Sequence, residues 1–100
     1  MKRLIAKRIT EQEKQFIQEC EDCGKFDDDQ MDEIYRGFRK GLSLEQVKLF
    51  ANPEFNDKQM EIVRGGFEGG LSMEEVNLYA KPEFSFVQMI GISEELKNHR

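Results

Sequence analysis

The feature that most constrains this chain is an internal repeat with a period of 29 residues. Residues 26–54 and 55–83 carry the same amino acid at 15 of 29 aligned positions, and the start of the unit recurs from residue 84. Agreement of this extent in one register indicates duplication. Because so short a unit cannot bury an apolar face by itself, neighbouring copies must stack to build one core.

Most positions that the copies share, in identity or in type, begin helices. A residue able to cap a helix is followed three positions later by Gln or Glu, which is the capping-box spacing. The pairs are Thr10 with Glu13, Asp27 with Gln30, Ser43 with Gln46, Asn56 with Gln59, Ser72 with Glu75, and Ser85 with Gln88. Apolar residues flank most of these caps at the spacing of the hydrophobic staple, as Phe55 and Met60 do. The sequence therefore predicts about six short helices.

Glycine and proline mark where these helices end. Gly41 and Gly70 suit the left-handed residue after a helix, and Pro53 and Pro82 cannot continue one. Each unit thus predicts a helix of about 12 residues, a glycine turn, and a helix of about 8 that is apolar nearly all round. Glycines within the longer helices, at positions 37 and 66, predict that a neighbouring helix approaches closely.

The predicted fold is all-α, with tandem helix-turn-helix (αα-hairpin) repeats in one compact domain spanning residues 1–100. Its parts are an N-terminal capping helix (1–25), repeat 1 (26–54), repeat 2 (55–83) and a truncated repeat 3 (84–100). Apolar stripes at helical spacing form the expected core: Met31, Ile34 and Phe38, then Met60, Val63 and Phe67, then Met89, Ile92 and Leu96. The shorter helices should be sandwiched between neighbours, and the terminal helices should present polar outer faces.

Charge is distributed unevenly, and this bears on the kind of partner. The net charge is −5, yet Lys2, Arg3, Lys7 and Arg8 place +4 near the start and leave −9 on the remainder. The acidic body disfavours nucleic acid as a partner, and we expect the basic start to be solvated. Apolar runs fall short of the roughly 18 residues of a membrane span, and no export signal is recognisable. We therefore expect a cytoplasmic protein with reduced cysteines.

The Gln-Met, Gly-Phe, Gly-Leu-Ser and Ala-x-Pro-Glu-Phe positions resemble those of a recurrent short helical tandem repeat. That repeat occurs in uncharacterised proteins of gut Gram-positive bacteria, and the resemblance covers about residues 26–92. It implies a bacterial helical repeat protein. It carries over no activity and no functional residue.

Structural roles explain the two cysteines and the acidic run better than catalytic or metal-binding roles do. Cys20 and Cys23 lie at the acidic C-terminal end of a helix, which disfavours thiolate, and zinc would need more ligands than the remote His99 supplies. We expect both cysteines to be buried, although a site shared between two chains stays open. The acidic run at residues 27–29 lacks the central glycine of a calcium loop. No catalytic set is recognisable, so we expect no enzyme, no metal and no cofactor.

The predicted function is a protein-interaction or scaffold module, because stacked repeats commonly bind other proteins. The candidate partner surface lies where the copies differ: Arg36, Arg39, Lys40 and Lys48 in the first, Glu68 and Asn77 in the second. The alternative is a helix-turn-helix-like DNA-binding regulator, in which residues 41–48 form the turn and recognition helix. That helix has few polar side chains that could hydrogen-bond to a base edge.

Overall fold

The computed structural model describes residues 9–99, and this part of the chain is all-α. Its helices are α1 (Glu11–Cys23), α2 (Asp28–Arg39), α3 (Leu44–Phe50), α4 (Asp57–Glu68), α5 (Met73–Asn77) and α6 (Phe86–Asn98). The predicted fold class is confirmed. The basic residues at positions 2, 3, 7 and 8 lie outside the described residues.

All six predicted capping boxes are formed, each with the cap side chain and the third helical residue bonded to one another's backbone. In α4, the Asn56 side chain accepts from the Gln59 backbone at 2.8 Å, and the Gln59 side chain accepts from the Asn56 backbone at 2.8 Å. The turns also follow the prediction, because Gly41 and Gly70 have φ of 89° and 95°, a region that favours glycine.

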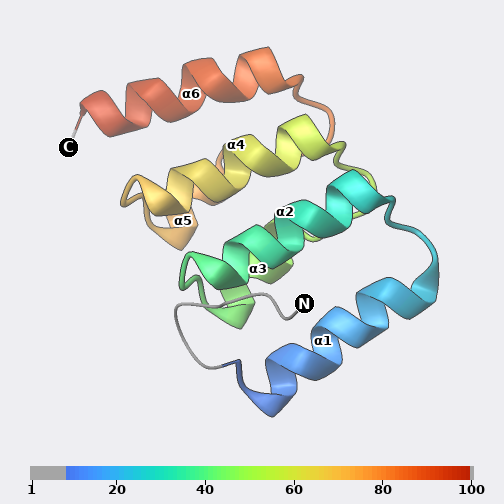
Figure 1. The fold of residues 1–100 in the computed structure, drawn as a ribbon. Helices are drawn as coiled ribbons and strands as arrows, with labels where there is room; N and C mark the ends of the chain where they lie inside the picture. The colour runs from blue at the N-terminus through green and yellow to red at the C-terminus, as the bar shows by residue number, and fades with distance from the viewer. Residues whose placement is uncertain (1–8, 100) are drawn as a thin grey trace.

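Four helices lie side by side in one layer, in the order α1, α2, α4, α6, with α3 and α5 packed behind them (Figure 1). The three helices that open a unit, α2, α4 and α6, run in the same direction, and α1 runs against them. This arrangement follows from the repeat, because each short second helix returns the chain to the end where the next unit begins.

The core runs along the inside of the two layers. The predicted stripes of α2 and α4 are buried, α3 contributes Val47 and Phe50, and α5 and the turn after it contribute Val76 and Tyr79. Gly37 and Gly66 allow the expected close approach: a Cβ on Gly37 would lie 2.7 Å from the Phe50 ring, and one on Gly66 would overlap the Tyr79 hydroxyl.

Two expectations about α5 are wrong. It has 5 helical residues rather than about 8, because tighter bonds close its end, from Leu78 N to Glu75 O and from Tyr79 N to Val76 O. It is also not sandwiched, since Met73 and Leu78 remain 42% and 58% exposed. Their counterparts on α3, Leu44 and Leu49, are packed against the core.

The expectation of a polar outer face on the C-terminal helix is wrong as well. Met89 is buried, but Phe86, Val87 and Ile90 of α6 are exposed, and Val87 reaches 65%. The exposed surface of α6 is therefore partly apolar. None of the helices within residues 9–99 is long and apolar enough to cross a membrane.

Candidate functional site: the open end of the helix stack

Consecutive units are joined through the side-chain amide of one glutamine. Gln30 Nε2 donates to the carbonyl oxygens of Phe55 at 2.6 Å and Pro53 at 3.3 Å. Gln59 Nε2 donates to Phe84 at 2.7 Å and Pro82 at 3.1 Å, in the next copy of the same turn. The oxygen of each glutamine closes a capping box while its nitrogen holds the Pro-Glu-Phe turn that follows.

Sequence reasoning assigned these glutamines to capping alone and missed the second role. A signal was present, since the helices that open a unit carry Gln30, Gln59 and Gln88 at this position, whereas the second helices carry Gln46 and Glu75. Either residue type can close a capping box. Only an amide can also donate to a carbonyl, so Gln30 and Gln59 can make the inter-unit bonds and a glutamate in their place could not.

Gln88 closes its capping box, accepting from Ser85 N at 2.8 Å, but its side chain is exposed. Beside it lies an open groove of about 490 Å³ on α6. The groove is lined by Phe84, Gln88, Gly91, Ile92, Glu95 and Leu96. Most of the lining is apolar, with the glutamine amide and the Glu95 carboxylate as its polar groups.

The corresponding surfaces of the first two units are covered. On α2, Val47 and Phe50 pack over Gly37, and on α4, Val76 and Tyr79 pack over Gly66. The position of these glycines is occupied in α6 by Glu95, 29 residues beyond Gly66. The α6 groove is thus the uncovered form of an interface that the chain builds twice internally.

A row of charges of alternating sign joins α2 to α4. Arg64 is buried, at 7% exposure, and bonds Glu33 at 2.8 Å and Glu68 at 2.6 Å. Arg36 continues the row to Glu33 at 3.6 Å and to Asp32 at 3.2 Å. Burial lowers the pKa of the Arg64 guanidinium, but its two carboxylate partners outweigh burial and raise the pKa overall. This network is part of how the units pack.

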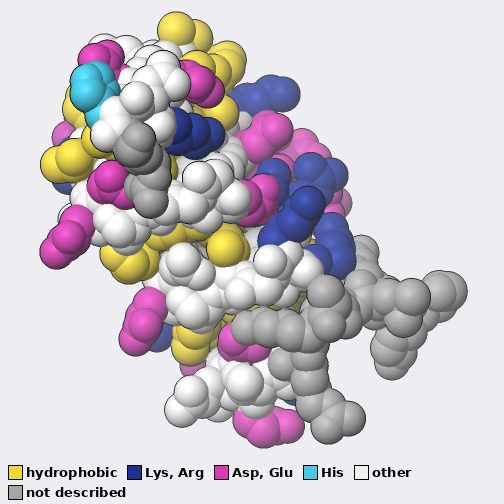
Figure 2. Space-filling view, turned by 90° about the vertical axis from the view of Figure 1, so that its left-hand side faces the viewer, with side chains coloured by type: hydrophobic (Ala, Val, Ile, Leu, Met, Phe, Trp, Pro, Cys, Tyr) yellow, Lys and Arg dark blue, Asp and Glu magenta, His cyan; other side chains and the backbone are white. Residues whose placement is uncertain are grey.

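The six residues predicted to bind a partner are dispersed. Arg36 and Glu68 belong to the network just described, and Arg39 and Lys40 lie at the C-terminal end of α2. Lys48, on α3, lies 5.8 Å from the ring centroid of Phe16 in α1, and exposed Asn77 ends α5. Seen from the side where α2, α4 and α6 end, basic side chains gather next to acidic ones (Figure 2). The role of these residues in binding stays a prediction.

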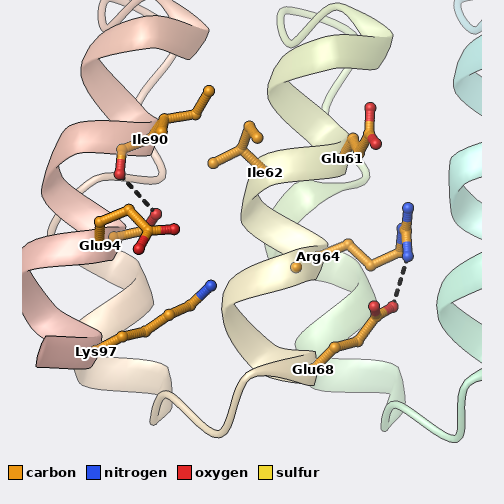
Figure 3. A pocket seen from close by; sticks show the side chains of 9 residues that line it. Glu61, Ile62, Arg64, Glu68, Ile90, Glu94 and Lys97 are labelled. Carbon is orange, nitrogen blue, oxygen red and sulfur yellow. Dashed lines mark hydrogen bonds and ion pairs between the residues drawn. The ribbon is translucent and has the colours of Figure 1, made fainter. Parts of the chain in front are cut away.

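A second groove, of about 240 Å³, runs between α4 and α6 (Figure 3). Its lining residues are Glu61, Ile62, Arg64, Gly65, Glu68, Ile90, Ser93, Glu94 and Lys97. Gly65 stands in it where the first unit has Arg36, and a Cβ on Gly65 would meet no atom within 4 Å. Acidic and basic groups are mixed along it, so its charge does not select one ionic ligand.

The two cysteines have different environments. Cys20 is buried, whereas Cys23 is exposed, so the expectation that both are buried is wrong for Cys23. Burial, followed by the neighbouring Cys23, Glu19 and Glu21, raises the pKa of the Cys20 thiol to about 11, which keeps it protonated. Within residues 9–99 no three His, Cys, Asp or Glu side chains come together as a metal site would require.

Comparison with protein-family models, with curated protein sequences and with solved structures finds no match in any of the three. The resemblance to short helical repeats of gut bacteria stays a prediction.

Proposed function

We propose that this chain is a non-enzymatic protein-interaction module that binds its partner at the open end of the helix stack. The observation that carries the proposal is the α6 groove, because its counterparts on α2 and α4 are each covered by polypeptide. The faces of α2 and α4 that correspond to this groove pack against polypeptide of the same chain. The α6 groove offers the same kind of side chains to another protein.

Exposed apolar side chains elsewhere on α6 support this proposal. Phe86, Val87 and Ile90 of α6 are all exposed. Clustered exposed apolar residues mark interaction surfaces in soluble proteins, because covering them removes apolar area from water. The groove adds directional groups, since the Gln88 amide can donate to a partner's backbone.

Affinity capture with matched leucine variants tests the proposal. The bait carries its tag at the N-terminus, so that α6 stays free, and lysate of the source cells is passed over it with and without nuclease. Leu96→Asp places a charge in the groove, and Leu78→Asp places the same charge on an exposed leucine outside it. Circular dichroism checks that both variants fold.

We expect specific proteins to be retained by the unmodified chain and by Leu78→Asp, and lost from Leu96→Asp. If Leu96→Asp fails to fold, Gln88→Glu takes its place, because a glutamate preserves the capping box. Retention that is equal in all variants would refute binding at the groove. Loss of all captured material after nuclease treatment would favour the DNA-binding alternative.

A further inference from the structure

We infer that the α6 groove binds a segment of another polypeptide with the chemistry of this chain's own helix–turn segment, meaning residues 43–55 and 72–84. Such a segment has a short apolar helix followed by Ala-x-Pro-Glu-Phe. The inference rests on the proposed function and specifies the partner. It extends an interface that the structure already contains twice.

The polar half of the recognition comes from Gln88. In the first two units, the equivalent glutamine donates two hydrogen bonds, to the carbonyls of the proline and of the phenylalanine in the turn. Gln88 occupies the same helical position, and its oxygen is fixed in the same way by its own capping box. Its amide nitrogen is therefore oriented to donate to the same pair of carbonyl oxygens in a bound segment.

The apolar half comes from Phe84, Ile92 and Leu96. They stand at the positions of Phe55, Val63 and Phe67 in the second unit, where these side chains are buried beneath the following segment. In the third unit all three are only partly buried, and they line the groove. A bound segment with a valine at the position of Val76 would cover them as α5 covers α4.

Glu95 makes the third unit selective for a bound segment with a small residue in place of the aromatic one. The large aromatic side chains of Phe50 and Tyr79 fit over Gly37 and Gly66 because no Cβ is present there. At Glu95 a Cβ is present, so a segment that docks in the same way must carry a small residue in place of the aromatic one. The preferred segment thus reads Val-x-x-Ala-Ala-x-Pro-Glu-Phe rather than Val-x-x-Tyr-Ala-x-Pro-Glu-Phe.

A second copy of the folded chain does not supply this segment. Its own two segments are held in its core, where Phe50, Phe55 and Tyr79 are fully or almost fully buried. Releasing either would expose these aromatic rings to water, at a large loss of stability. A segment of another polypeptide that is not held in such a core does not carry this cost, and it is the occupant that we assign.

The test uses a synthetic peptide of residues 71–84 with both ends blocked and with Tyr79→Ala, added to the ¹⁵N-labelled chain. We expect saturable shifts of the Gln88 side-chain amide and of the backbone amides of Gly91 and Leu96. The Gln59 side-chain amide, already bonded inside the stack, should stay unchanged and serves as the internal control.

Variants of the two selective groups make the test specific. Gln88→Glu keeps the capping box and removes the donor, so binding should weaken about 30-fold, as expected for two lost hydrogen bonds. Glu95→Gly should reverse the preference, so that the peptide with the original tyrosine binds at least as well as its alanine variant.

No shift at α6 with millimolar peptide would overturn the inference, as would equal binding to Gln88→Glu. Shifts of α6 that depend on chain concentration without peptide would show a second copy on this surface and would also overturn it. If the peptide fails while lysate capture still depends on Leu96, the proposed function stands and only this identification of the partner fails.

Discussion

The double role of Gln59 leads to a sharp prediction about stability. Replacing Gln59 with glutamate retains the oxygen that closes the capping box and removes the nitrogen that donates to Pro82 O and Phe84 O. Each lost hydrogen bond should destabilise the fold by about 1 kcal/mol, and the two carbonyls left without a donor add a further desolvation penalty. Gln59 is only 7% exposed, so water cannot fully replace the lost amide. We expect a total loss of about 2–4 kcal/mol.

Gln88→Glu is the matched control, because it makes the same change in the same capping box on an exposed side chain. Any favourable interaction of the new charge with the helix N-terminus is common to both variants. We expect Gln88→Glu to change stability by no more than about 0.5 kcal/mol.

Urea unfolding followed by circular dichroism measures both variants against the unmodified chain. A loss of 2–4 kcal/mol in a chain of this size also corresponds to a melting temperature lower by about 10–25 °C. If Gln59→Glu loses less than about 0.5 kcal/mol, or if both variants lose the same amount, the inter-unit role of the amide is refuted.

Three further predictions follow from single contacts. Gly66→Ala should destabilise the chain by about 1–3 kcal/mol because its Cβ would overlap the hydroxyl of Tyr79, whereas Gly65→Ala, which meets open space, should stabilise it by up to about 1 kcal/mol in the same urea assay. Tyr79→Phe should stabilise by about 0.5–1.5 kcal/mol, because the buried hydroxyl finds no hydrogen-bond partner within residues 9–99. Burial also raises the pKa of Tyr79 from 10.0 to about 12, so the neutral phenol is favoured in the folded state. The contribution of the buried Tyr79 side chain to the free energy of unfolding should be constant below pH 10 and be lost as the pH rises towards 12. In Tyr79→Phe this pH-dependent loss should be absent. Ellman's reagent should react with one thiol per folded chain, exposed Cys23, and with two after unfolding, when Cys20 is released; two thiols reacting at equal rates in the folded chain would contradict the burial of Cys20.

The elements of the fold could be predicted because their signals are local. A capping box joins residues three positions apart, and a glycine turn depends on one backbone conformation, as at Gly41 and Gly70. The duplication then fixed the order of the elements, since two similar units must bury similar stripes. The length of α5 departed from the prediction, because bonds to the third preceding residue close its end.

The candidate site could not be predicted in the same way. Gln30 reaches carbonyls 23 and 25 residues away, and Arg64 pairs with Glu33 at a separation of 31 residues. The sequence showed that Arg36 and Glu68 differ between the copies, but only the packed helices show that both belong to the Arg64 network.

The sequence by itself determined where helices begin and where they turn, because these properties depend on neighbours within one or two helical turns. The tertiary structure decided which apolar side chains remain uncovered. Ile92 and Leu96 lie in the same repeat register as Val63 and Phe67, yet the second pair is buried and the first lines an open groove. Burial of a side chain depends on what packs against it, and at α6 the described chain supplies no further helix–turn segment.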